Sequence, residues 1–243
     1  MVGLGTIINV FAIIVGTTLG ILLHKFIPER LQNTVVSGVG LSVCFVGVSG
    51  VISKMLVPTN GRFDTKDTML MVASLVIGAF VGELLNIEKQ LEKFGNFCKS
   101  HIKSKKENAR FTEGFVSASL LFCVGAMAIV GSLEDGLSGD YTTLFAKSLM
   151  DGTISIFFAA TMGAGVFLSI LPVAVYQGAI TLLAGVIKPL LSNVLIDQIS
   201  LVGSVLIFAI GINMCANTKI KTGNLLPAVL VPVFYNIAIS FFS

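Results

Sequence analysis

Charged side chains are scarce in this sequence. Only 12% of its 243 residues are Asp, Glu, Lys or Arg, whereas a soluble domain carries about 25%. Such a chain has too few polar groups to cover its surface in water. Hydrophobic residues make up 54% of it, and the mean hydropathy is +0.93. The missing charge therefore excludes an ordinary soluble domain and favours a protein that folds in a lipid bilayer.

Patterns for metal, cofactor and catalysis are missing as well. The two histidines, His24 and His101, do not form an H-E-x-x-H motif, and no two of the four cysteines share C-x-x-C spacing. An intramembrane aspartyl protease needs two facing aspartates, but only Asp151 lies near an apolar run. No glycine-rich phosphate loop with a lysine is present. We therefore expect no metal, no cofactor, no enzymatic activity and no nucleic-acid partner.

Long apolar runs, by contrast, recur along the whole chain. Each is near 20 residues and continuous, which is the length of a membrane-spanning helix and not of a barrel strand. We predict an all-α integral membrane protein, a polytopic bundle of eight transmembrane helices that forms a single domain over residues 1–243. The predicted spans are 3–23, 35–56, 68–87, 111–133, 145–170, 171–191, 200–215 and 225–242.

The fifth and sixth predicted spans form one apolar run, broken only around Ser169 and Pro172. Proline disfavours helix in the residue before it. A tight turn there gives eight spans, whereas a re-entrant sixth segment gives seven. The linker 88–110 holds seven Lys and Arg residues, which predicts a cytoplasmic location. Eight spans with both termini outside fit the basic residues best, and the first span, with no basic residue before it, is not expected to be a cleaved signal peptide.

Internal similarity links the first two helix pairs. Residues 12–33 resemble residues 74–95, and each copy has a G-x-x-x-G step, at Gly16 and Gly20 and at Gly78 and Gly82. The helices that follow also correspond, and a weaker third copy comes later, so we place repeats over 1–56, 66–133 and 145–216. Such glycine steps most often mark close helix packing. Repeats that meet at the membrane centre are common in transporters.

Ionisable groups inside spans are costly, so each is a candidate for a site. Asp151 lies four residues after Lys147, which places both on one helical face where they can pair. They either mark the membrane interface or form a site. Glu83 occurs where the first repeat has Ile21, and it is either a proton- or cation-binding residue or a structural one.

Uncharged polar residues add further candidates within or near the spans. They are Asn9, Tyr176, Gln177, Asn213 and Asn236. Tyr176 and Gln177 follow Pro172 by about one turn, and broken helices at membrane depth typically line a cavity. The alternative is interhelical hydrogen bonding, which contributes about 0.6–2 kcal/mol per bond.

Five stretches resemble a known family. They are 5–20, 115–144 (FVSASLLFCVGAMAIVGSLEDGLSGDYTTL), 146–166, 172–185 and 220–230. Together they are similar to the bacterial membrane family called domain of unknown function 554. The resemblance covers essentially the whole chain and implies a multi-pass protein of the bacterial plasma membrane. It implies no substrate and no catalytic residues.

These features predict a transporter or channel for a small solute or ion. The alternative is a non-transporting sensor or scaffold that binds a partner through the linker 88–110, where Leu91, Phe94 and Phe97 suggest an amphipathic helix at the cytoplasmic interface. Besides the lipid bilayer, we expect the partners to be a small solute or ion and further copies of the chain in a homo-oligomer.

Overall fold

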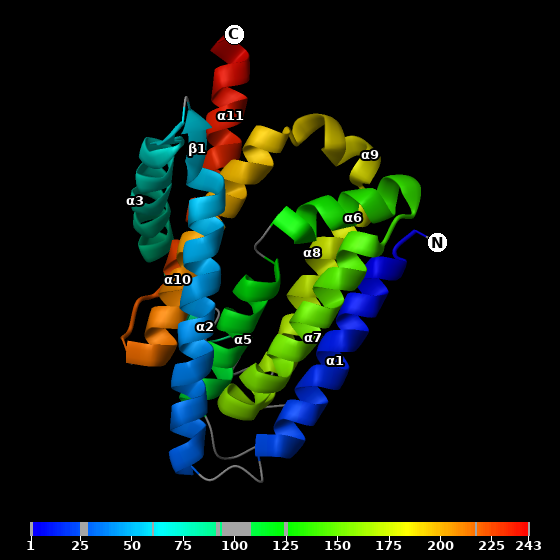
Figure 1. The fold of residues 1–243 in the computed structure, drawn as a ribbon, viewed down its shortest axis with the longest axis vertical. Helices are drawn as coiled ribbons and strands as arrows, with labels where there is room; N and C mark the ends of the chain where they lie inside the picture. Colours follow the sequence, from blue (N-terminus) through cyan, green and yellow to red (C-terminus); the bar gives the residue numbers. More distant parts are fainter. Residues whose placement is uncertain are drawn as a thin grey trace. The chain divides into compact units, whose positions relative to one another are not determined.

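A computed structural model describes residues 2–24, 29–59, 61–90, 93, 108–123, 126–216 and 218–242. Helices make up most of the described chain (Figure 1). The chain divides into two compact units. Unit 1 holds Met1–Val39 and Leu91–Leu190, and unit 2 holds Gly40–Gln90 and Leu191–Ser243. Helix α2 (Glu29–Met55) contributes residues to both.

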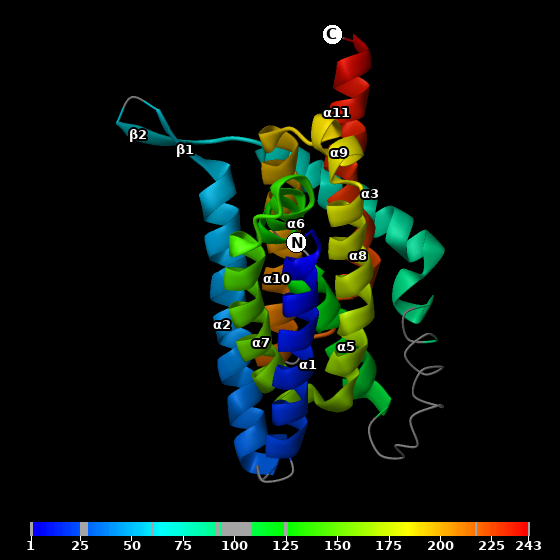
Figure 2. The same cartoon turned by 90° about the vertical axis from the view of Figure 1, so that its right-hand side faces the viewer.

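Unit 1 is built around three long apolar segments. Besides the first part of α2, its elements are α1 (Leu4–His24), α5 (Asn108–Cys123), α6 (Ala126–Ser138), α7 (Thr142–Met162), the 3-10 helix η1 (Gly163–Ser169), α8 (Ile170–Leu182), α9 (Ala184–Ile187) and the 3-10 turn η2 (Lys188–Leu190). Helices α1, α7 and α8 lie side by side (Figures 1 and 2). The predicted span 111–133 is divided between α5 and α6, which are inclined by 58°.

Helices α7 and α8 form a helical hairpin. In one straight helix, Asp151 and Gln177 would lie about 39 Å apart at 1.5 Å per residue. Instead, both accept a hydrogen bond from the side chain of Asn9, at 3.0 and 3.2 Å. The chain therefore reverses between them, as the sequence predicted for this apolar run.

The reversal begins earlier than predicted. It starts at Gly163, whose φ of 75° and ψ of −154° belong to a region that is essentially restricted to glycine. The 3-10 segment η1 then leads into α8. Pro172 is the third residue of α8, and in the first turn of a helix its missing amide N–H removes no helical hydrogen bond. The glycine, and not the proline, sets the position of the turn.

Glycines bring the helices of unit 1 into close contact. A Cβ atom at Gly16 would overlap the carbonyl oxygen of Gly152, and one at Gly20 would overlap that of Ile156. This confirms the packing interpretation of the first G-x-x-x-G step. Helix α6 lies across the ends of α7 and α8 (Figure 1), with Gly136 against Thr181.

Unit 2 contains the rest of α2, a β-hairpin and, among the described residues, four further helical segments. Its elements are β1 (Leu56–Thr59), β2 (Arg62–Thr65), α3 (Thr68–Leu85), α10 (Asn193–Ala216), the 3-10 helix η3 (Thr222–Leu230) and α11 (Val231–Phe242). The two strands pair antiparallel, with Leu56 opposite Thr65 and Thr59 opposite Arg62. The hairpin was not predicted.

Helices α2 and α10 pack antiparallel in unit 2. A Cβ atom at Gly40 would meet Met214, and one at Gly50 would meet Ser204. Helix α3 packs against η3 in the same way, because Gly78 lies against Ala228. The second glycine step is thus a packing surface, like the first.

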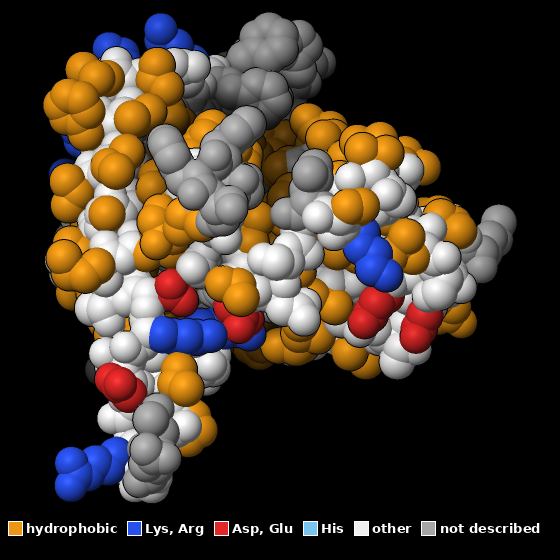
Figure 3. Space-filling view, turned by 90° about the horizontal axis from the view of Figure 1, so that it is seen from above, with side chains coloured by type: hydrophobic (Ala, Val, Ile, Leu, Met, Phe, Trp, Pro, Cys, Tyr) orange, Lys and Arg blue, Asp and Glu red, His pale blue; other side chains and the backbone are white. Residues whose placement is uncertain are grey.

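Six helical stretches of the described residues are long and apolar enough to cross a membrane, or seven if α5 and α6 count as one bent span. One of the six is the whole stretch Thr142–Leu182, which folds back on itself. Its second arm, α8, has 13 residues and is about 20 Å long, shorter than the ~30 Å hydrocarbon core. Eight spans therefore remain a prediction. Seen from above, the surface carries few charged side chains (Figure 3).

Candidate functional site

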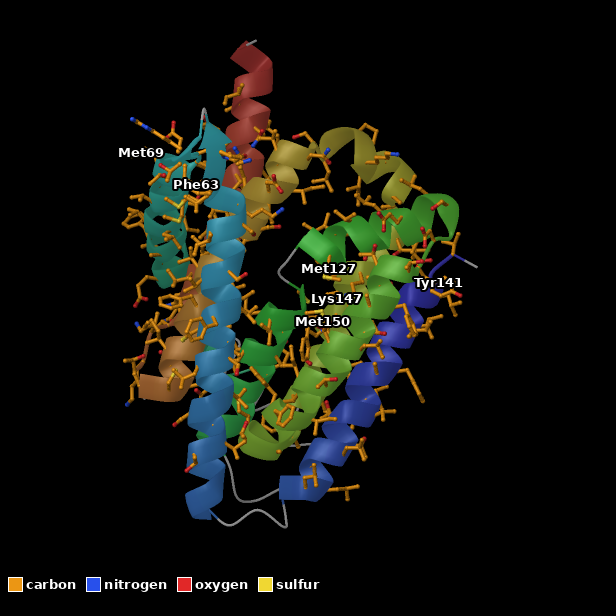
Figure 4. All side chains as sticks on the ribbon, viewed as in Figure 1. Phe63, Met69, Met127, Tyr141, Lys147 and Met150 are labelled. Atoms are coloured by element: carbon orange, nitrogen blue, oxygen red, sulfur yellow. The ribbon has the colours of Figure 1, made fainter. Side chains whose placement is uncertain are left out.

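A buried ion pair lies on α7 of unit 1. The Lys147 ammonium is 2.8 Å from Oδ1 and 2.6 Å from Oδ2 of Asp151. The two residues are 6% and 4% exposed, and Lys147 is labelled in Figure 4. Their spacing of four places them one turn apart on the same face. The predicted pairing is confirmed, and the pair is enclosed by the protein.

Helices α1 and α8 each add a buried carboxamide to this pair. Asn9 and Gln177 are both fully buried. The amide nitrogen of Asn9 donates to Oδ2 of Asp151 at 3.0 Å and to Oε1 of Gln177 at 3.2 Å. Three of the predicted candidates, from three helices, therefore form one hydrogen-bonded cluster with Lys147. We call these four residues the unit-1 cluster.

The ion pair fixes the direction of this network. A carboxylate only accepts hydrogen bonds, so Asn9 must turn its NH₂ group toward Asp151. The same NH₂ group donates to Oε1 of Gln177, so the NH₂ group of Gln177 points away from Asn9. As a result, Oδ1 of Asn9 and Nε2 of Gln177 are buried and have no protein partner.

Two hydroxyl groups one turn away on the same helices are also buried without a hydrogen-bond partner among the described residues. Thr6 lies one turn before Asn9 on α1, and Thr181 lies one turn after Gln177 on α8. Both hydroxyls are buried without a hydrogen-bond partner. An unsatisfied buried polar group costs about 1–3 kcal/mol, so native proteins rarely keep several together. The cluster and these two hydroxyls thus have hydrogen-bonding capacity that no group of the described residues uses.

The close contact of α1 and α7 makes the cluster possible. Gly16 and Gly152 let the two backbones approach, which brings the short side chain of Asn9 within reach of α7. One turn further along α7, the hydroxyl of Ser155 donates to the carbonyl of Ile13 at 3.5 Å. The thiol of Cys123 on α5 is near enough to interact electrostatically with both members of the ion pair.

A second buried carboxylate fixes the start of α1. Asp135 on α6 is fully buried, and its two oxygens accept hydrogen bonds from the backbone N–H groups of Gly3 and Gly5, each at 3.1 Å. The first N–H groups of a helix have no partner within it and favour negative charge. Asp135, which lies on another helix, supplies both the hydrogen-bond acceptors and the negative charge. This role of Asp135 was not predicted from the sequence.

The other predicted candidates do not join the unit-1 cluster. Tyr176 is half-buried on α8 and interacts with Cys123. In unit 2, Glu83 accepts hydrogen bonds from Lys221 and Asn224, both at 2.6 Å, and its side chain is 58% exposed. The raised pKa of Lys221 follows from its hydrogen bond to Glu83.

The last two candidates belong to separate contacts in unit 2. Asn213 closes a loop, because its Oδ1 accepts from the Ile220 N–H at 2.9 Å and its Nδ2 donates to the Ile220 carbonyl at 2.8 Å. Asn236 donates to Oε1 of Gln198 at 2.6 Å. Whether these residues bind a solute stays a prediction. Within the described parts of the chain, no three His, Cys, Asp or Glu residues are grouped to hold a metal ion.

These observations define the class: an all-α integral membrane protein with several membrane-spanning helices and a buried polar cluster. The chain belongs to the family described as "Protein of unknown function (DUF554)", whose model matches residues 4–237. It is 34% identical over 229 residues to "Uncharacterized membrane protein YdfK" of Bacillus subtilis (strain 168), covering 94% of this chain and 93% of the relative. It is 29% identical over 232 residues to "Uncharacterized protein YqgA" of Escherichia coli (strain K12), covering 94% of each. No solved structure matches it.

Proposed function

We propose that the protein is a transporter or channel for a small solute or ion, and that the solute binds at the unit-1 cluster. The observation that carries the proposal is the fully enclosed Lys147–Asp151 pair with its two carboxamides. Ionisable residues are rare in membrane-spanning segments, and those present typically mark ion or substrate pathways. A chain of this hydropathy has little reason to enclose a charged pair for stability alone, since a buried pair often contributes no more than apolar packing.

Interhelical hydrogen bonding alone does not account for the cluster. Such bonds stabilise helix packing when both partners are satisfied. Here two amide atoms and two hydroxyls are left without partners. A solute or water that donates to Asn9 and accepts from Gln177 would satisfy the two amide atoms. This mixture of donors and acceptors suits binding better than packing.

The chain reversal beside the cluster supports the same proposal. Helix α8 is short, and η1 replaces regular helix between α7 and α8. Non-helical backbone at membrane depth occurs where it is buried in protein or lines a cavity. Transporters often build their sites beside such interrupted helices.

The test is solute flux in proteoliposomes, measured against a panel of ions, amino acids and organic acids. We expect flux of at least one solute, and we expect Asp151→Asn to change its rate or its pH dependence. Asp197→Asn is the matched control, because it removes an aspartate that pairs with a lysine in unit 2. No flux of any solute through correctly folded protein would overturn the proposal.

Other expectations remain proposals of the same kind. The absence of enzymatic activity, assembly into a homo-oligomer and both termini outside are each open to direct measurement. The alternative scaffold role depends on the linker 88–110, which lies largely outside the described residues.

A further inference from the structure

We propose that the unit-1 cluster binds a small monovalent anion together with a proton, which Asp151 takes up while Lys147 and Gln177 hold the anion. This inference rests on the proposed function and specifies the class of its solute. It follows from three features of the cluster. Both charged residues belong to the same helix, the pair is neutral as a whole, and hydrogen-bond donors beside it have no partner among the described residues.

The helix that carries both residues keeps the Lys147 ammonium beside the Asp151 carboxylate. Lys147 and Asp151 lie on the same helix, four residues apart, so no movement of one helix against another separates them. The ammonium contacts both carboxylate oxygens and so takes the position that an alkali cation would need. A cation that entered beside it would place two positive charges next to one carboxylate.

Charge balance then selects the solute. The resting pair is neutral, and a proton on Asp151 leaves Lys147 with an uncompensated positive charge. A buried charge without a partner is strongly unfavourable. A monovalent anion restores neutrality, so one proton and one anion enter together and the pair Lys147–Asp151 becomes an ammonium–anion pair beside a neutral carboxyl group.

The groups around the pair favour this exchange. The free NH₂ group of Gln177 and the free hydroxyls of Thr6 and Thr181 are all donors for an anion. Once protonated at Oδ1, Asp151 can donate to the anion, while its Oδ2 goes on accepting from the NH₂ group of Asn9. Helix α6 contributes the carboxylate of Asp135, whose two oxygens accept from the backbone N–H groups at the start of α1.

Helices α5 and α8 bring two further titratable groups toward the pair, a thiol and a phenol. Helix α5 contributes the thiol of Cys123, which interacts with both Lys147 and Asp151. Helix α8 contributes the phenol of Tyr176, which in turn interacts with Cys123. Among the described residues of α1, the buried polar side chains are an amide and hydroxyls, and none of them is ionisable. The proton is therefore assigned to Asp151.

Binding is measured first, by calorimetric titration of nitrate and, separately, acetate into purified protein in detergent, with ionic strength held by sulfate. One proton taken up per anion makes the apparent affinity rise about tenfold for each unit fall in pH, by linkage. Asp151→Asn leaves the ammonium permanently free, so we expect tight binding that no longer depends on pH and takes up no proton.

Removal of both charges tests the anion half of the proposal without leaving a buried charge. We expect the double variant Lys147→Met, Asp151→Asn to lose nitrate and acetate binding by at least tenfold. The pair Lys54→Met, Asp197→Asn, which removes an ion pair in unit 2, should bind as the wild type does. Gln177→Met should weaken binding several-fold, whereas the buried Gln198→Met of unit 2 should not.

Flux is measured second, with a pH-sensitive dye inside proteoliposomes. An inward nitrate gradient should acidify the lumen for the wild type and not for Asp151→Asn. Binding with proton uptake but no flux would overturn the transport function and leave this inference standing. Flux of another solute with no binding of either anion, or lumen alkalinisation driven by sodium, would overturn this inference and leave the transport function standing.

Discussion

Removing either residue of the α7 ion pair should lower the free energy of unfolding, whereas removing both should leave it nearly unchanged. Lys147→Met leaves the Asp151 carboxylate enclosed with Asn9 as its one remaining hydrogen-bond donor among the described groups. Asp151→Asn leaves the ammonium enclosed. Removing one partner of a buried pair typically costs about 3–5 kcal/mol. Replacing both with neutral side chains is often neutral or stabilising, so we expect the double variant to unfold with nearly the wild-type free energy.

The cost of each single change has an upper limit. Neutralising the charge that is left would cost a carboxyl or an ammonium group of ordinary acidity about 4–5 kcal/mol at pH 7, so the buried charge costs no more than this. Each single variant should therefore lose about 3–5 kcal/mol. The double-mutant cycle should then give a coupling free energy of about 6–10 kcal/mol, the sum of the two single losses, well above the roughly 0.5–3 kcal/mol usual for residues in contact.

The measurement is the free energy of unfolding in mixed micelles, from SDS titration followed by the helical circular dichroism signal. The control is the same cycle on Lys54 and Asp197, which are 2.6 Å apart but 28% and 32% exposed. Solvent screening should keep that coupling below about 1 kcal/mol. Additive losses for Lys147 and Asp151 would refute the reasoning, because they would mean that the two charges do not compensate each other in the folded protein.

Three further outcomes are expected from the packing and capping contacts. Gly16→Leu should destabilise unit 1 by at least about 2 kcal/mol, since its side chain meets the backbone of α7, whereas Gly178→Ala, with open space around it, should be neutral or slightly stabilising in the same SDS titration. Asp135→Ala removes both acceptors of the first α1 N–H groups and should cost about 2–4 kcal/mol, with hydrogen exchange fastest at the start of α1. Asp140 accepts a hydrogen bond from Thr142, and this bond lowers the pKa of Asp140. Its contribution to the free energy of unfolding is therefore present above pH 3.8 and is lost as the pH falls through the lowered pKa. The difference in stability between the wild type and Asp140→Ala should accordingly vanish in acid.

Local patterns predicted the parts of the site that depend on one helix. The spacing of Lys147 and Asp151 fixed their shared face, because helix geometry places residues four apart together. Asn9 and Gln177 were each predicted as polar residues in apolar spans. That Asn9 contacts both Asp151 and Gln177 could not be predicted, because the contacts join positions 142 and 168 residues apart in sequence. Such contacts depend on which helices pack together.

The differences in the fold have identifiable causes. The β-hairpin of unit 2 had a local signal, since Asn60-Gly61 is typical of a two-residue hairpin turn, but a hydropathy reading treats such a segment only as a loop. The turn after α7 was placed at a proline, although Gly163 has the backbone conformation that starts it. The role of Asp135 was not predicted, because nothing in its own segment shows that it caps a helix far away in sequence.

The similar segments 12–33 and 74–95 share the glycines that pack helices together, but they do not share the residues of the unit-1 cluster. In both copies the glycine step packs a helix closely against a neighbour, as Gly16 and Gly78 show. The same offset pairs Asn9 with Met71 and Ile21 with Glu83, so the second copy has no amide where the first holds the ion pair. Its carboxylate lies instead at an exposed end of α3. The shared sequence thus explains helix packing, whereas Asn9 is the one unit-1 cluster residue that lies near the first segment, and Met71 stands at the matching position of the second.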